Sequence, residues 1–206
     1  AVKDSEWYNI HKAVMGQKNA EAVMDLCYPL RFHKAYIEQR IKNILNDRKG
    51  EIQIVNPDAY ENKIVLELTS ICMKSIVADM HTLKSKIKFV GDNSQERFQF
   101  YMKERFGTAD KIECFFEEYT VLARMLATRI VFHLNNLRFF IDSIVEKKNE
   151  LHEKFGVNSF EIRFLSMGAG DSHSHGKSVL LVEIGQKKFA YKYKNLEVGE
   201  KFNQFV

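Results

Sequence analysis

Between residues 112 and 145, apolar side chains recur every three or four positions, and no proline or glycine interrupts the run. This spacing predicts one or two long helices with one buried face. Another helix is expected to start with Asn56 as its N-cap and Pro57 at its first position, and to run towards Met80. The segment 32–45 has a similar pattern, so helices are expected to dominate this part of the chain.

A few polar residues in the helical region invite a functional interpretation. Ser94 is expected to cap one more helix, which Gly107 would end. His133 lies on an apolar helix face and is interpreted as a hydrogen-bonded core histidine in preference to a ligand. Asp79 and His81, near a predicted helix end, are interpreted as cap or surface residues.

The hydrophobic period changes to two residues after Gly156, which is typical of half-buried strands. The alternation predicts one strand over residues 160–164 and a second over 179–184. Gly185-Gln186 suits a two-residue hairpin turn with glycine first, and leads into a third strand over residues 188–194.

These patterns predict an α+β fold. A mainly helical region, residues 1–155, is followed by a β-rich region, residues 156–206, which begins with three antiparallel strands. The chain has 206 residues, of which 45% are hydrophobic, enough for one sizeable core. Its formal net charge of +4, with both signs interspersed, is too weak a bias to favour nucleic acid as a partner.

Neither a membrane-spanning segment nor a secretory signal is visible in the sequence, so a cytoplasmic protein is expected. The three cysteines are widely separated and lack the spacing of zinc ligands. They are interpreted as buried, reduced thiols: Cys27, Cys72 and Cys114.

The chemically richest segment, residues 167–178, joins the first two predicted strands and is expected to be a loop. It contains Gly168, Gly170 and Gly176. Glycine lets a backbone turn with positive φ and approach a ligand, so that amide N–H groups can face an anion. The segment is not a Walker A loop, because Asp171 occupies the place of the first glycine and a strand follows where that motif needs a helix.

A better match is the kinase arrangement, in which a glycine loop between two antiparallel strands covers the phosphates and a lysine on the third strand binds them. Because side chains alternate along a strand, Ala190 and Lys192 share one face, where the small residue leaves room for an adenine. A surface hairpin with a solvated lysine remains an alternative. A metal cluster of Asp171, His173 and His175 is disfavoured, since neighbours on a glycine loop seldom complete a coordination sphere.

Three short motifs follow one another in a specific order and spacing: Gly170-Asp171-Ser172-His173, Gly176-Lys177-Ser178-Val179 and Tyr191-Lys192. Together they resemble the dehydratase domain of class II lanthipeptide (lantibiotic) synthetases, the LanM enzymes. The resemblance extends upstream through Asp79-Met80-His81-Thr82-Leu83 and Asn93-Ser94-Gln95-Glu96-Arg97-Phe98 to Arg105-Phe106.

The resemblance implies a fold similar to lipid kinases and a kinase-like N-lobe in residues 156–206. It implies an enzyme that uses ATP and Mg²⁺ to phosphorylate Ser and Thr of a ribosomal precursor peptide with a leader. The same domain would then eliminate the phosphate to give dehydroamino acids. A C-terminal zinc cyclase domain would close thioether rings with cysteine.

By position, the resemblance implies that Lys192 binds the ATP phosphates beside residues 167–178, called the glycine segment below. It also implies that Asp171 and His173 support phosphoryl transfer. Tyr193 stands where the family commonly has proline. The Mg²⁺ ligands and the cyclase are expected beyond Val206, so the chain is expected to be part of a larger enzyme and inactive alone. The alternatives are a non-enzymatic helical interaction module and a lipid-kinase-like phosphotransferase.

Overall fold

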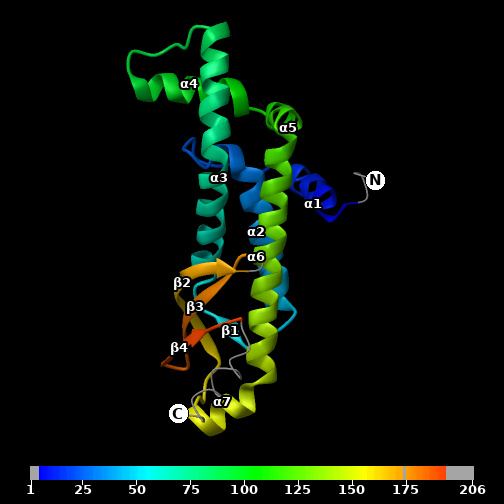
Figure 1. Ribbon diagram of the computed structural model, residues 1–206, viewed down its shortest axis with the longest axis vertical. Helices are drawn as coiled ribbons and strands as arrows, with labels where there is room; N and C mark the ends of the chain where they lie inside the picture. The colour runs from blue at the N-terminus through cyan, green and yellow to red at the C-terminus, as the bar shows by residue number, and fades with distance from the viewer. Residues whose placement is uncertain (1–4, 174, 194–206) are drawn as a thin grey trace. The chain divides into compact units, whose positions relative to one another are not determined.

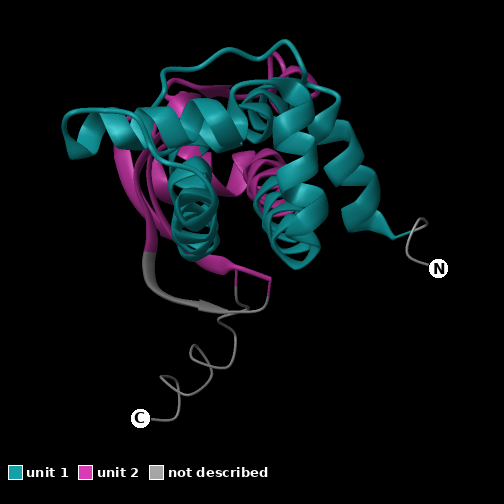
Figure 2. Ribbon diagram, turned by 90° about the horizontal axis from the view of Figure 1, so that it is seen from above, with its two compact units in different colours: residues 1–43, 61–134 teal, residues 44–60, 135–206 magenta. Residues whose placement is uncertain are grey.

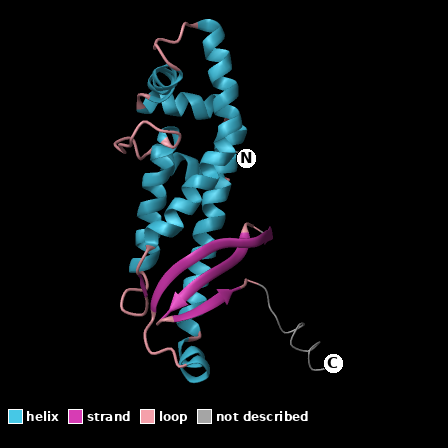
Figure 3. Ribbon diagram, turned by 90° about the vertical axis from the view of Figure 1, so that its left-hand side faces the viewer, coloured by secondary structure: helices cyan, strands magenta, loops and turns pink. Residues whose placement is uncertain are grey.

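The computed structural model describes residues 5–173 and 175–193, and for residues 169–173 it describes the backbone alone. A series of helices precedes a small mixed sheet, so the fold is α+β, as predicted (Figure 1, Figure 3). The helices are α1 (Glu6–Met15), η1 (Tyr28–Leu30), α2 (Arg31–Asn46), α3 (Pro57–Lys86), α4 (Ser94–Phe106), α5 (Ala109–Glu118), α6 (Thr120–Glu146) and α7 (Lys148–Phe155). The strands are β1 (Gln53–Ile54), β2 (Glu161–His173), β3 (Lys177–Ile184) and β4 (Lys187–Tyr191). None of the described helices is long and apolar enough to cross a membrane.

The chain divides into two compact units, coloured separately in Figure 2. The first comprises residues 1–43 and 61–134, and the second comprises residues 44–60 and 135–206. Helices α2, α3 and α6 each contribute residues to both units. The change from helix to strand falls between Phe155 and Glu161, as predicted, whereas a domain boundary at that point stays a prediction.

Aromatic side chains form much of the core of the first unit. Phe106, Phe115 and Phe116 are fully buried, and the Phe115 ring lies 4.9 Å from that of Phe106 and 5.2 Å from that of Phe116. Such edge-to-face contacts add to the hydrophobic gain of burial. The long apolar run forms two helices because Tyr119, with φ −102° and ψ 52°, leaves the helical region between α5 and α6.

The start of α3 and the end of α4 lie where the sequence predicts them, whereas α3 continues past Met80 to Lys86 and two caps differ. The N-cap of α4 is Asn93 instead of Ser94, because its side chain accepts the Glu96 amide at 2.9 Å. Asn56 precedes α3 as predicted, yet its side chain does not cap the helix. It forms two 2.9 Å hydrogen bonds with the backbone N–H and carbonyl of Phe164 on β2.

The buried polar residues of the first unit correct one prediction and confirm another. Asp79 is neither a cap nor a surface residue: it is 6% exposed, since α4 supplies partners that cover it. The hydroxyl of Tyr101 donates to it at 2.9 Å, and Nε of Arg105 lies 3.1 Å from both carboxylate oxygens. His133 is a buried core histidine, as predicted, and its Nε2 lies 2.8 Å from Glu67.

The burial of the three cysteines agrees only in part with the prediction from the sequence. Within the described residues all three are free thiols. Cys72 is buried and burial raises the pKa of its thiol to about 12. Cys27 is only partly buried and Cys114 is exposed, so the prediction of buried thiols is wrong for these two. Cys114 lies on the face of α5 that also carries Glu118, 3.7 Å away, and this face is exposed.

His33 makes the stability of the first unit depend on pH. Its side chain is 1% exposed against Phe116, and burial, assisted by nearby His11, lowers the pKa of His33 from 6.5 to about 3. The unfolded chain therefore takes up this proton near pH 6.5, and the folded chain only near pH 3. Acid thus favours the unfolded chain, and His33 alone lowers the free energy of unfolding by about 2 kcal/mol between pH 8 and pH 5.

Urea unfolding of the wild type and of His33→Leu at pH 8, 7, 6 and 5 tests this dependence. The wild type is expected to lose more stability than the variant below pH 6.5, with the difference growing towards pH 5. Parallel stability profiles for the two proteins would contradict it.

The four strands form one sheet in the order β1-β2-β3-β4 in the second unit. The β2–β3 and β3–β4 pairs are antiparallel, as predicted. The turn between β3 and β4 is Gly185-Gln186, with φ of 53° and 69°. The short strand β1 pairs in parallel with β2 and was not predicted, because two residues carry no readable alternation.

Candidate functional site

The glycine segment and Lys192 lie at the same end of the sheet. In the strand register, Met167 on β2 pairs with Leu180 on β3, which pairs with Tyr191 on β4. Gly168 directly follows Met167, and Lys192 directly follows Tyr191. Because β2 and β4 run in the same direction, Gly168 and Lys192 are level with one another across the three strands. Because neighbouring strands lie about 4.8 Å apart, the backbones of β2 and β4 are separated by about 10 Å at this level.

The glycine segment is mostly strand, so the prediction of a long loop over residues 167–178 is wrong. β2 continues to His173, which pairs with Lys177 at the base of a tight turn. The register shifts several times along β2, and Gly168 has a φ of 85°. Glycine permits these irregularities while pairing continues, and a sequence pattern cannot distinguish a bulged strand from a loop.

The described part of the turn between β2 and β3 has the positive φ angles that its glycine predicts. Gly176 has a φ of 74°, and His175 before it has a φ of 63°, which is uncommon for a residue with a side chain. The side-chain amide of Asn136 on α6 donates to the carbonyl of His175 at 3.1 Å. This hydrogen bond fixes the described part of the turn to the helix.

Two tyrosines of the ribbon face helix α6. The ring of Tyr191 packs edge-on against Phe140 at 4.9 Å, and its hydroxyl donates to Oγ of Ser143 at 3.0 Å. The hydroxyl of Tyr193 donates to the carbonyl of Asn136 at 3.1 Å. The sheet thus lies along the last turns of α6, as Figures 1 and 3 show within the second unit.

Ala190 and Lys192 alternate with these tyrosines, so they lie on the opposite, open face of the sheet, and both are exposed. The prediction that they share a face is confirmed. Ala190 pairs with Leu181, which is 37% exposed, and Leu165 nearby on β2 is 44% exposed. Lys192 makes no hydrogen bond or ion pair with any described side chain. The open face therefore offers a small apolar surface beside an exposed cation, which suits a flat ring joined to an anionic group.

The other predicted site residues can be placed by backbone only. Gly170, Asp171 and His173 belong to the last residues of β2, and the side chains of Asp171 and His173 lie outside the described ones. Their predicted roles in phosphoryl transfer therefore stay predictions. Among the described residues no group of three or more His, Cys, Asp or Glu could hold a metal ion, so we assign no Mg²⁺ ligand to them.

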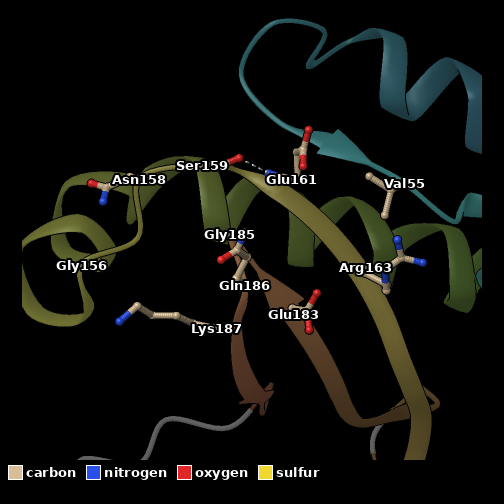
Figure 4. A pocket seen from close by; sticks show the side chains of 10 residues that line it. All are labelled: Val55, Gly156, Asn158, Ser159, Glu161, Arg163, Glu183, Gly185, Gln186 and Lys187. Carbon is tan, nitrogen blue, oxygen red and sulfur yellow. Dashed lines mark hydrogen bonds between the residues drawn. The ribbon is translucent and has the colours of Figure 1, made fainter.

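A separate hollow of about 590 Å³ lies at the opposite end of the sheet, at the Gly185-Gln186 turn (Figure 4). Side chains of both charges line it, namely those of Glu161, Glu183, Arg163 and Lys187. Lys187 begins β4 and Lys192 follows its end, which separates the hollow from Lys192 by about 16 Å. None of the predicted site residues lines this hollow.

The polar residues of α6 that hold the ribbon were missed at the sequence level. Asn136 is 6% exposed in the middle of the apolar stripe. A buried amide must find hydrogen-bonding partners, so this position carried a signal, but the sequence does not say which strand supplies them. Ser143 gave no signal at all.

Comparison with known protein families finds a match in the C-terminal part of the chain. Residues 119–206 match a family model described as a domain of unknown function, DUF4135. The matched segment includes α6, α7 and the β2–β4 ribbon, with Lys192 and all three site glycines. No curated protein matches the chain.

Proposed function

We propose that this chain supplies the ATP-binding ribbon of a lanthipeptide dehydratase. The enzyme would phosphorylate Ser and Thr side chains of a ribosomal precursor peptide with ATP and then eliminate the phosphate to give dehydroamino acids. The finer family assignment rests on the motif residues, of which those between Gly170 and Lys192 fall within the matched segment, residues 119–206, and those upstream do not.

One observation carries the proposal: the register sets Lys192 level with the glycine segment and directs it to the open face. An exposed ammonium without a partner among the described residues can bind phosphate oxygens as a point charge. The backbone amide at Gly168, where φ is positive and the register is level with Lys192, can face the same anion. The apolar patch of Leu181 and Ala190 leaves room for an adenine ring.

ATP supplies the phosphoryl group, and phosphoryl transfer depends mainly on positioning and on neutralising charge at the phosphates. Lys192 would contribute one positive charge to that neutralisation. Asp171 and His173 would act beside it, and Mg²⁺ would be held by residues other than those described. The hollow at the Gly185-Gln186 turn has no part in this proposal.

Titration of the full-length protein with ATP–Mg²⁺ is the first test. Saturable binding that depends on Lys192 supports a nucleotide site. A non-enzymatic helical module instead predicts no saturable heat and no dependence on Lys192. The alternatives therefore give opposite results in one experiment.

The acceptor is tested separately with ATP labelled at its γ-phosphate. Transfer of label to Ser or Thr of the precursor peptide, followed by its loss as dehydrated peptide appears, supports the dehydratase. Transfer to a phosphoinositide without transfer to the peptide would instead establish a lipid-kinase-like phosphotransferase.

A further inference from the structure

Lys192 stands between two tyrosines whose hydroxyls are both bonded to α6. Tyr191 donates to Ser143 and Tyr193 donates to the carbonyl of Asn136, at 3.0 and 3.1 Å. Strand β4 ends at Tyr191, so the ladder with β3 no longer holds Lys192. The hydrogen bond of Tyr193 is the next contact along the chain that fixes this backbone to the helix.

Packing keeps the Tyr193 hydroxyl in place. Its ring lies 5.0 Å from that of Tyr191 and 6.0 Å from that of Phe139, and Nζ of Lys177 lies 5.9 Å from its centroid. Burial raises the pKa of Tyr193, so the hydroxyl keeps its proton at neutral pH and continues to donate. The ring and the hydroxyl together hold the strand end against α6.

Asn136 joins this strand end to the β2–β3 hairpin that carries the glycines, called the glycine ribbon below. Its carbonyl accepts the hydrogen bond from Tyr193, and its side-chain amide donates to the carbonyl of His175. One buried residue of α6 therefore fixes both the chain beside Lys192 and the described part of the turn between β2 and β3.

We propose that Tyr193 and Asn136 are positioning residues that set Lys192 and the glycine ribbon at the separation needed to bind one set of phosphates. This inference rests on the proposed ATP site and adds the residues that shape it. Effective positioning tolerates little error, because displacement of a binding group by about 1 Å can cost two orders of magnitude in rate. Tyr193 acts through Lys192 and touches no substrate.

Tyr193→Phe removes the hydroxyl and keeps the ring. In the full-length protein it is expected to lower kcat/KM for ATP by about five- to tenfold, as the loss of one hydrogen bond predicts, with the melting temperature nearly unchanged. The matched control is Tyr36→Phe, which removes the hydroxyl of another buried tyrosine, on α2, and is expected to leave kcat/KM unchanged. Equal losses in both variants would overturn the inference.

A double-mutant cycle tests whether Tyr193 acts through Lys192. In the Lys192→Ala background, Tyr193→Phe is expected to cause no further loss of ATP affinity. An undiminished additional loss would show that Tyr193 acts independently, which would overturn the positioning role. Asn136→Ala is expected to weaken ATP binding as well. Because Asn136 is buried and this variant is liable to misfold, Tyr193→Phe is the primary test.

Hydrogen exchange without ATP separates this inference from the proposed function. Amides of residues 187–193 are expected to exchange faster in Tyr193→Phe than in the wild type, because the strand end loses its anchor. Unchanged exchange would overturn the positioning role even if ATP binds. Faster exchange in a protein that binds no ATP would confirm the anchor but overturn the ATP site, and with it the positioning of phosphates.

Discussion

Replacement of Lys192 by alanine in the full-length protein is expected to abolish both phosphorylated and dehydrated peptide. The variant loses an exposed cation that the strand register places level with Gly168. Removal of one charge-stabilising group from an active site lowers kcat by about two to three orders of magnitude. Mass spectrometry of the precursor peptide after incubation with ATP–Mg²⁺ measures both products.

The chain contains a close control for this experiment. Lys188 lies on β4, an even number of residues before Lys192 and so on the same face, is also exposed, and pairs with Glu183 at the far end of the strand. Lys188→Ala changes the net charge equally but about 13 Å from the site, so dehydration is expected to persist. Normal dehydration by Lys192→Ala would refute the ATP site, and equal losses in both variants would indicate a general effect of charge.

Regular elements were largely predictable because their signals are local. The helical spacing gave α2, α3 and α6, and the two-residue alternation gave the faces of β2 to β4. Alternation alone also placed Ala190 and Lys192 together on one face, because it depends only on backbone geometry. These features need no knowledge of which elements pack together.

Other features depend on partners distant in the sequence, and these were missed. Asn56 appeared to be a helix cap until β2, more than a hundred residues later, supplied the Phe164 backbone as its partner. Tyr193 appeared only as a departure from the family pattern, whereas the structure bonds it to Asn136 on α6. The glycine segment was predicted as a loop because bulges depend on the register with the neighbouring strand.

The same dependence on distant partners explains the second large effect that we expect. Asp79→Ala is expected to lower the free energy of unfolding of the first unit by about 3 kcal/mol, because breaking a buried ion pair leaves its partners uncompensated. Arg105 and Tyr101 would both lose their buried acceptor, although Arg105 keeps its contact with Glu118. Thermal and urea unfolding measure the loss, which corresponds to about 6–12 °C in melting temperature for a chain of this length.

An exposed ion pair of the same unit provides the control. Glu104 lies 3.6 Å from Lys111 and both side chains are more than 40% exposed, so Glu104→Ala is expected to change stability by less than about 0.5 kcal/mol. If Asp79→Ala proved as mild as Glu104→Ala, the burial of Asp79 would not be stabilising α3 against α4. A large loss would show that Asp79 and Arg105, which both fall within the motif segments of the family resemblance, hold the helical unit together.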